Sequence, residues 1–200
     1  MKRVSSVPDE TKTPLHVLEE SEEAEVIHTL ARTIDRRIFH LINDLPHSPA
    51  SDRYIGILSD LGEGFGWVGA GIGIAWLGGR RGRRAGLATA LASLSATHLV
   101  QRLIKPVFRR RRPFIDREAL VVGVRPADAS FPSGHAASSF AAATVLSIFY
   151  PRAAPLVFGL AAGVGASRVH LGVHFPSDVA VGSVIGVVVG AVTSALLRDR

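Results

Sequence analysis

The sequence predicts an all-α protein, a polytopic transmembrane helical bundle, on three observations. Hydrophobic residues make up 47% of the 200 residues and gather into five segments of helical length. The last segment runs for nineteen residues without a charge, close to the roughly 20 needed to cross the hydrocarbon core of a bilayer. The segments are also rich in Gly and Ala, which favours close helix packing inside a membrane.

The five predicted spanning helices cover Leu61–Gly79, Ala85–Ile104, Ala136–Tyr150, Ala153–Ser167 and Val179–Leu197. Several are short or contain polar residues, so each alone could equally be a buried helix of a soluble bundle. The last helix carries glycines at four-residue intervals on one face, which lets a neighbouring helix approach closely. These are Gly182, Gly186 and Gly190.

The N-terminal part differs from the rest of the chain. Residues 1–24 are polar and predict a flexible tail, with no cleavable signal peptide expected at its start. Residues 25–200 form the predicted membrane-embedded domain. Apolar residues from Val26 to Leu45 recur every three or four positions, which predicts an amphipathic helix. Its other face is charged, so we expect it to lie in the membrane interface; a helix of a soluble domain is the alternative.

Charge and composition limit the kinds of molecule that the protein is expected to bind. The formal net charge is +6 and cysteine is absent, which excludes disulfides and thiolate metal sites. The arginines punctuate apolar segments, as at Arg80–Arg84 and Arg109–Arg112. A nucleic-acid-binding protein would place them on a polar, aromatic-containing surface, so no nucleic acid is expected. The composition instead indicates a membrane protein that handles anions.

Three short motifs fall in two loops. The first is a lysine, six residues and an Arg-Pro pair, from Lys105 to Pro113. The second is Pro-Ser-Gly-His at 132–135. The third, from Ser167 to Asp178, is a Ser-Arg pair, five residues, a histidine, three residues and an aspartate. The predicted helix order puts the loops 105–135 and 167–178 on the same side of the membrane, so the motifs should meet.

The cations of these motifs suit a phosphoryl group. Phosphoryl transfer spreads negative charge over several oxygens, and fixed positive donors stabilise it. Arg112 and Arg168 offer planar forks and Lys105 a point charge. The prolines after Lys105 and Arg112 predict an extended loop there. For Arg109, Arg110 and Arg111 we expect only contacts with lipid headgroups.

The remaining motif residues have distinct predicted roles. Ser133 should cap the next helix and Gly134 should let backbone N–H groups approach the phosphate. His135 is placed to protonate the leaving oxygen. Pro176 should begin the last helix, so that Asp178 orients His174 as a nucleophile.

In order and spacing, the three motifs resemble those of the type 2 phosphatidic acid phosphatase family, which is related to the vanadium haloperoxidases. The resemblance implies a metal-independent phosphatase without a cofactor. It also implies a phosphohistidine on His174, with His135 and Asp178 as the other catalytic residues. Phosphate binding would fall to Lys105, Arg112, Ser133, Gly134 and Arg168.

The implied substrate is a lipid phosphate monoester or pyrophosphate in the bilayer: phosphatidic acid, phosphatidylglycerophosphate, or a polyprenyl phosphate or pyrophosphate. A prenyl-linked sugar phosphate at the cytoplasmic face is an alternative. A soluble phosphate ester, vanadate peroxidase chemistry and a non-catalytic lipid-binding protein are weaker alternatives. The expected location is the cell membrane, as a multi-pass protein of unassigned oligomeric state.

Two observations point to opposite sides of the membrane for the motif loops. Many family members act on the extracytoplasmic side. Without the three phosphate-binding cations, however, twelve Lys or Arg remain on the motif side against seven on the other, which favours a cytoplasmic site.

A metal centre is the main rival for the third motif. His170, His174 and Asp178 are spaced by four residues, and on one helix they would form a ligand triad. Pro176 argues against an uninterrupted helix, and the nearby cations disfavour a divalent ion. We therefore expect no metal here. His170 is expected to be a polar residue of the bundle, and the histidines outside the motifs to be structural or solvated: His16, His28, His40, His47 and His98.

Overall fold

The computed structural model describes residues 15–116 and 119–198, and this part of the chain is helical with no strand. Its elements are α1 (Leu15–Asn43), α2 (Pro49–Leu61), α3 (Gly64–Leu77), α4 (Gly79–His98), the π-helix η1 (Leu99–Ile104), α5 (Lys105–Phe108), the 3-10 turn η2 (Pro113–Asp116), α6 (Gly134–Phe149), the 3-10 turn η3 (Pro151–Ala153), α7 (Ala154–His170) and α8 (Pro176–Arg198). The predicted all-α class is confirmed.

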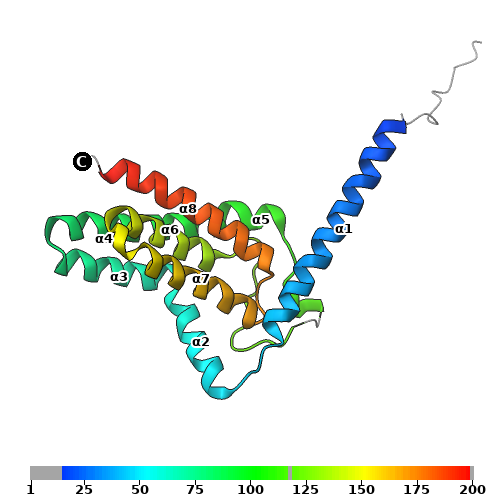
Figure 1. The fold of residues 1–200 in the computed structure, drawn as a ribbon, viewed down its shortest axis with the longest axis horizontal. Helices are drawn as coiled ribbons and strands as arrows, with labels where there is room; N and C mark the ends of the chain where they lie inside the picture. Colours follow the sequence, from blue (N-terminus) through cyan, green and yellow to red (C-terminus); the bar gives the residue numbers. More distant parts are fainter. Residues whose placement is uncertain (1–14, 117–118, 199–200) are drawn as a thin grey trace, which may run out of the picture.

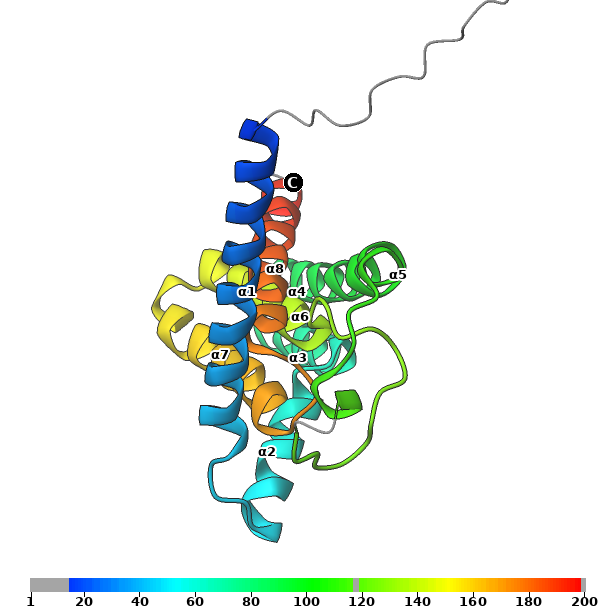
Figure 2. The ribbon, with the colours of Figure 1, turned by 90° about the vertical axis from the view of Figure 1, so that its right-hand side faces the viewer.

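The helices form a bundle with a long rod at one end. In Figure 1, α3, α4, α6, α7 and α8 make up the bundle, and α2 and the loop after α5 lie at one end of it. Helix α1 contacts α7 and α8 near its C-terminus and extends well beyond the bundle in Figures 1 and 2. The loops that carry the three motifs therefore open at one end of the bundle.

The five predicted apolar segments correspond to α3, α4 with η1, α6, α7 and α8. Helix α2 was not predicted. One helix in the described part of the chain is long and apolar enough to cross a membrane by itself: Pro176–Leu197, 22 residues with a mean hydropathy of 2.2. Helices α3 and α6 are apolar but shorter. The number of spanning helices therefore stays a prediction.

Glycines set the distance between α6 and α8. A methyl group added at Gly182 would lie 2.4 Å from the carbonyl oxygen of Ser133, and one at Gly186 would lie 2.3 Å from that of Ala137. Real Cβ atoms do not approach backbone oxygens so closely, so only glycine permits this spacing. The predicted close approach is confirmed, and α6 is the partner helix.

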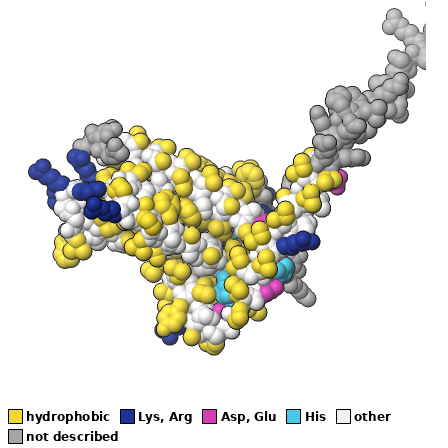
Figure 3. All heavy atoms as spheres, viewed as in Figure 1, with side chains coloured by type: hydrophobic (Ala, Val, Ile, Leu, Met, Phe, Trp, Pro, Cys, Tyr) yellow, Lys and Arg dark blue, Asp and Glu magenta, His cyan; other side chains and the backbone are white. Residues whose placement is uncertain are grey.

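Small side chains fill the bundle interior. The main core cluster is dominated by alanines of α4 and α6. Larger apolar side chains lie outside: Ile72, Trp76 and Leu77 of α3 and Leu196 of α8 are 64–86% exposed. Figure 3 shows apolar side chains over much of the visible bundle surface, and basic side chains gathered at the end where α3 meets α4. Such an apolar exterior suits a lipid environment better than water.

Helix α1 begins at Leu15, earlier than the predicted start at Val26; residues 1–14 of the predicted tail lie outside the described residues. Its apolar stripe is exposed, as expected for an interfacial helix. The opposite face contacts the bundle through three buried side chains, Asp35, Phe39 and Asn43.

The prediction of an extended loop is met before Pro113 in that residues 109–112 are not helical, and it is wrong at Pro106. Instead of an extended loop, the chain stays helical through Phe108, with Pro106 in the first turn of α5. The π-helical turn of η1 lies directly before it. A proline at a helix start needs no hydrogen-bond donor, and the wider π turn changes the hydrogen-bond register just before the ring. The helix ends at Arg109, which has a positive φ of 43°.

Candidate active site

The guanidinium of Arg112 lies at the centre of the site and joins the loops of the first and third motifs. Its Nη1 donates to the carbonyl of Val173 at 2.8 Å and lies 3.3 Å from Nε2 of His174. Its Nη2 donates to Oδ1 of Asp128 at 2.6 Å. Arg112 is 2% exposed, so its charge is held in place and largely removed from water.

Asp128 joins the two cations of the first motif. The Nζ of Lys105 donates to Oδ2 of Asp128, while Arg112 binds Oδ1. Lys105 is 5% exposed, whereas the Asp128 side chain is 39% exposed. A carboxylate thus occupies the donors that a phosphate would use.

His174 lies in the short connection between α7 and α8 and is 2% exposed. Because Arg112 donates toward its Nε2, that nitrogen carries a lone pair and the proton belongs on Nδ1. Nδ1 lies 3.5 Å from Oδ2 of Asp178, a distance too long for a good hydrogen bond, and it has no other partner. The ring therefore presents an unprotonated nitrogen toward the cations and turns the other toward a carboxylate.

Asp178 lies in the first turn of α8, and three hydrogen-bond donors fix its carboxylate. Its Oδ2 accepts from the Ser130 hydroxyl and from the Phe175 backbone N–H at 2.8 Å. Its Oδ1 accepts from Nη1 of Arg110 at 2.8 Å. Helix α8 begins at Pro176, as predicted, and this start directs the carboxylate back toward the preceding loop.

Arg110 connects this carboxylate to α1. Its Nη2 donates to Oδ2 of Asp35 at 2.7 Å, and its guanidinium lies 4.3 Å from the centroid of the Phe175 ring. Asp35 also accepts from the backbone and hydroxyl of Ser177. The prediction that Arg110 only meets lipid headgroups is wrong. The sequence cannot show which arginine of the run points inward, because that depends on the turn at Arg109.

Arg168, near the end of α7, is held from one side only. Its Nη1 donates to the Ser59 hydroxyl at 2.6 Å, whereas its buried Nε has no hydrogen-bond partner among the described residues. A buried donor without an acceptor is costly and marks a place where an acceptor is expected to bind. Ser59 belongs to α2, so α2 supplies one wall of the site. No motif or periodic pattern in the sequence indicates that α2 takes part in the site.

The helix cap predicted at Ser133 in the second motif is found in the structure. The hydroxyl of Ser133 caps α6 by accepting from the Ala136 N–H at 3.4 Å, and the Ser133 N–H donates to the Asp178 carbonyl at 2.9 Å. A Cβ added at Gly134 would make only ordinary contacts with its neighbours. The need for glycine there is therefore not set by the protein itself.

A cleft of about 600 Å³ opens beside these residues. His135 and Arg168 line it, together with three carboxylates of α2 and the turn that follows it, Asp52, Asp60 and Glu63. His174 and Arg112 are not among the lining residues. His174, which is 2% exposed, is therefore covered from this cleft.

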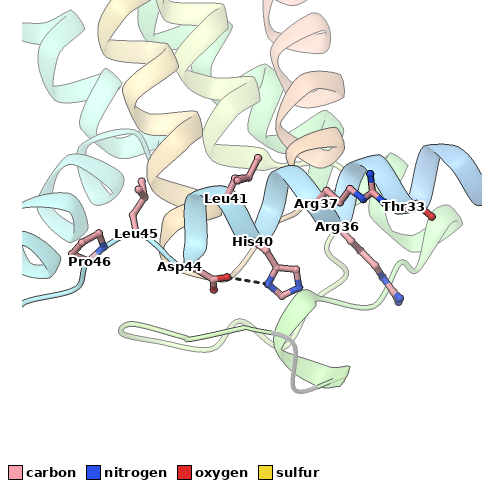
Figure 4. Close-up of a pocket in the computed structure, with 8 residues that line it drawn as sticks. All are labelled: Thr33, Arg36, Arg37, His40, Leu41, Asp44, Leu45 and Pro46. Carbon is pink, nitrogen blue, oxygen red and sulfur yellow. Dashed lines mark ion pairs between the residues drawn. The ribbon is translucent and has the colours of Figure 1, made fainter.

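A second hollow, of about 730 Å³, lies beside α1. Figure 4 shows its lining residues, among them His40 and Asp44, whose facing atoms are 3.6 Å apart. Neither side chain is buried, and none of the motif residues lines this hollow. It is not a candidate for the chemistry.

Burial keeps His174 neutral, and the neighbouring cations keep Asp128 ionised. Burial lowers the pKa of His174 to about 4; the Asp178 carboxylate opposes this shift, and the charge of Arg112 adds to it. Burial of Asp128 acts to raise its pKa, but the hydrogen bond and charge of Lys105 and the charge of Arg112 lower it to about 2. At neutral pH the histidine is therefore a free base.

The rival metal triad is not assembled. Helix α7 ends at His170 and α8 begins at Pro176, so His170, His174 and Asp178 do not lie on one helix. The Nδ1 of His170 faces the carbonyl of Ile42 at 3.2 Å instead. His174 and Asp178 belong to the anion site.

The structure thus brings together every predicted site residue: Lys105, Arg112, Ser133, Gly134, His135, Arg168, His174 and Asp178. It adds Asp128, Ser59, Arg110 and Asp35, which were not predicted. The fold and site together define an all-helical bundle with a basic, histidine-centred anion site at one end.

The chain belongs to the PAP2 superfamily, whose family model matches residues 86–200. This range contains all three motifs and excludes α1, α2 and α3. The unpredicted contributions of Asp35 and Ser59 therefore come from outside the matched range.

Several relatives are similar over this part. Decaprenylphosphoryl-5-phosphoribose phosphatase of Mycobacterium tuberculosis is 41% identical over 110 residues, which cover 54% of this chain and 60% of the relative. Its counterpart in Mycolicibacterium smegmatis is 41% identical over 100 residues, covering 50% of this chain and 53% of the relative. The matched part thus spans between half and two thirds of these relatives.

Two solved structures share the fold. LpxE of Aquifex aeolicus has a TM-score of 0.64 and 31% identity, covering 78% of this chain and 92% of that one. A transmembrane PAP2-type phosphatidylglycerolphosphate phosphatase of Bacillus subtilis has a TM-score of 0.69 and 23% identity, covering 88% and 90%. The second likeness concerns the fold alone.

Proposed function

We propose that the chain is an integral membrane, metal-independent phosphatase that removes phosphate from a lipid through a phosphohistidine on His174. The observation that supports this most is the convergence of Lys105, Arg112 and Arg168 around a buried neutral histidine. Arg168 keeps an unpartnered Nε beside the cleft. Three cations match the three equatorial oxygens of a phosphoryl group in transfer.

In the first step, the substrate phosphate displaces Asp128 from Lys105 and Arg112. Nε2 of His174 then attacks phosphorus, and the bond between phosphorus and the leaving oxygen breaks. In the empty site, burial and then the charge of Arg168 lower the pKa of His135 to about 3. The negative charge of the bound phosphate favours the protonated ring, which then donates its proton to the leaving oxygen. The phosphorylated imidazole is cationic, and the carboxylate of Asp178 stabilises it.

In the second step, His135 accepts a proton from water, and the resulting hydroxide attacks phosphorus. The bond between phosphorus and Nε2 breaks, and its electron pair returns to His174. Inorganic phosphate leaves, and Asp128 closes again over Lys105 and Arg112. The protein ends in its starting protonation state.

For the substrate we propose a polyprenyl-linked phosphosugar, of which decaprenylphosphoryl-5-phosphoribose is the leading example. Two relatives that are 41% identical over the matched region carry that activity in their names. The cleft supports this choice, because Asp60 and Glu63 offer carboxylate acceptors for sugar hydroxyls next to the phosphate site. Phosphatidic acid has no sugar to fill these positions.

A substrate panel tests this choice. Phosphate release by the purified full chain is measured with the prenyl-linked phosphoribose, phosphatidic acid, phosphatidylglycerophosphate and a polyprenyl pyrophosphate. We expect the highest kcat/KM for the phosphosugar. Equal or better turnover of phosphatidic acid would contradict the substrate proposal and leave the phosphatase proposal intact.

Trapping of the phosphoenzyme tests the mechanism. With labelled substrate and EDTA present, wild-type protein should yield an acid-labile phosphohistidine. His174→Ala should yield none and lose on the order of 10⁴-fold or more in phosphate release. His98→Ala, an exposed histidine of α4, is the matched control. Phosphoenzyme in His174→Ala would overturn the mechanism.

We further propose that α3, α4, α6, α7 and α8 span the membrane, with the motif loops on the cytoplasmic side. The excess of basic residues on that side supports this orientation. Because the chain has no cysteine, single cysteines can report it. In intact cells an impermeant thiol reagent should label Arg83→Cys, and Val124→Cys only after permeabilisation. The reverse labelling would place the site outside.

A further inference from the structure

The junction of α1, α2 and α7 holds three side chains that the phosphatase chemistry does not use: His47, Asp52 and His170. One ligand atom from each lies within 4.8 Å of the other two. His47 is in the connection between α1 and α2, Asp52 is in the first turn of α2, and His170 ends α7. The α1–α2 connection with the start of α2, and the distant end of α7, thus place metal-ligating groups at one point.

Both imidazoles are oriented by backbone carbonyls at the end of α1. Nε2 of His47 lies 2.9 Å from the carbonyl oxygen of Asn43, and Nδ1 of His170 lies 3.2 Å from that of Ile42. Each ring therefore donates one N–H to a carbonyl and turns its other nitrogen toward Asp52. Histidine ligands of protein-bound metals are held in this way, which fixes both tautomer and ring orientation.

The nitrogen of His170 that faces Asp52 is unsatisfied. Its Nε2 lies 3.7 Å from Oδ1 of Asp52, beyond hydrogen-bonding distance, and has no other partner. The side chain is only 8% exposed, and buried polar atoms without a partner are rare. On the other side, Nδ1 of His47 lies 2.8 Å from the same carboxylate oxygen. One cation among the three groups would satisfy all of them.

We propose that His47, Asp52 and His170 bind one divalent transition-metal ion of the zinc class. Two imidazole nitrogens and one carboxylate oxygen are a ligand set that zinc favours, with a fourth position left for water. The ion replaces the proton between His47 and Asp52, so the carboxylate keeps a positive partner. His170 supplies the third bond through its unpartnered nitrogen.

Binding requires a small rearrangement. Ligands about 2.0–2.1 Å from one tetrahedral zinc lie roughly 3.4 Å apart, closer than the present upper limit of 4.8 Å. The rings of His47 and His170 stack at 4.2 Å with an interplanar angle of 16°, so one ring has to tilt. His47 is free of helix constraints in its connection, and its ring is the one we expect to turn.

The position gives the ion a structural role beside the cleft. Asp52 lines the cleft, and His170 follows Arg168 by two residues. A bound ion would tie the start of α2 to the end of α7 and so hold one wall of the cleft against another. It takes no part in the transfer to His174, and the metal-independent mechanism is unaffected.

Direct metal measurements on the full-length protein, purified without a histidine tag, test the proposal. After chelation and dialysis, Zn²⁺ binding is followed by calorimetry, and Co²⁺ binding by its visible d–d absorption. We expect about one ion per chain and a higher Tm with Zn²⁺ than with EDTA. His47→Gln, Asp52→Asn and His170→Asn should each lose the Tm increase and at least tenfold in affinity.

His40→Gln is the matched control, because His40 faces Asp44 on α1 without a third ligand; it should bind Zn²⁺ like the wild type. A wild-type protein that binds no more Zn²⁺ than His47→Gln would overturn the proposal, as would an equal loss in His40→Gln. His47→Gln tests the site without changing a buried residue, should His170→Asn fail to fold. Because metal content is read directly, these results do not depend on phosphatase turnover.

Discussion

Two aspartates lie on opposite sides of the site, and the protein holds them in different ways. Asp178 is fully buried and accepts hydrogen bonds from Ser130, Phe175 and Arg110. Asp128 is 39% exposed and belongs to a loop, and among the residues that the structure describes its carboxylate is held by Lys105 and Arg112 alone. The Asp178 carboxylate is therefore fixed by the protein, whereas the Asp128 carboxylate can be displaced by a ligand.

The difference explains how one site can be stable when empty and still accept an anion. Two buried cations without a counter-charge would be costly, because burial penalises each charge. Asp128 offsets that cost until a phosphate arrives with more charge and more acceptor oxygens. Asp178 faces no such competitor, because its donors are Ser130, Phe175 and Arg110, none of which binds phosphate in the proposed mechanism. The following changes would break or sharpen this contrast.

The largest expected effect is that of Asp178→Asn. The variant keeps the shape but loses the charge that orients His174 and stabilises its phosphorylated form. We expect kcat to fall by on the order of 10³–10⁴-fold, with little change in the inhibition constant of inorganic phosphate. Steady-state kinetics measure both. Asp44→Asn, just after the end of α1, is the control. A kcat of Asp178→Asn within tenfold of wild type would exclude an orienting role for Asp178.

The next effect is a loss of stability in mild acid. The folded pKa of His174 is about 4, below its ordinary value of 6.5, so the unfolded chain binds a proton first as pH falls. His174 should therefore contribute a decrease in stability of about 3 kcal/mol between roughly pH 6.5 and 4. Burial also lowers the pKa of His135, to about 3, so His135 adds a loss of the same sign and the His174 contribution is the difference from a His174 variant. Denaturant unfolding at several pH values measures it.

His174→Gln should lack this particular loss, while Asp128→Asn should retain it. The pKa of Asp128 is about 2, against an ordinary 3.8, so its ion pairs are lost only at lower pH, as pH falls through that window. An unchanged acid profile in His174→Gln would contradict the assignment.

A smaller effect is expected for Arg110→Gln. Arg110 touches Asp178 and Asp35 rather than the substrate, so it acts by positioning the carboxylate beside His174. We expect kcat to fall by roughly 10- to 100-fold with KM nearly unchanged, in the range reported for groups that position a catalytic residue. Arg109→Gln is the neighbouring control, and Asp35→Asn should shift kcat in the same direction but less. Equal effects of Arg109→Gln and Arg110→Gln would contradict this role.

The smallest effect, and one of opposite sign, is expected for Asp128→Asn. Removal of this carboxylate leaves Lys105 and Arg112 without their competitor, so inorganic phosphate should inhibit about tenfold more tightly, a difference of about 1.4 kcal/mol. The same change should lower the Tm, because the two cations lose their counter-charge. Weaker inhibition by phosphate would show that Asp128 supports the anion site instead of competing for it.

The sequence predicts the parts of the site that are local in the chain. The cap at Ser133, the helix start at Pro176 and the glycine face of α8 each follow from a few adjacent residues, and each is found in the structure. The motif order also predicts that Lys105 and Arg168 lie on the same side of the bundle, and the structure brings them together at the ends of α5 and α7. Local residue chemistry and helix periodicity are sufficient for these features.

The remaining features depend on long-range geometry. Asp128 lies in a loop without periodicity, and Asp35 is one of several charges on α1, so nothing local marks either as a partner of a site cation. The helical course through Pro106 depends on the π turn before it. His47 meets His170 only because α1 and α2 turn around the end of α7. Tertiary packing decides these contacts.

The contact between α6 and α8 has a consequence for protein engineering. Gly182 lets α8 touch the carbonyl of Ser133, and the Ser133 N–H in turn binds the Asp178 carbonyl. Main-chain contacts, rather than the reactive side chains, thus fix the relative placement of the second and third motifs. A designer who grafts the motif loops onto another scaffold would have to transplant this helix pair with them.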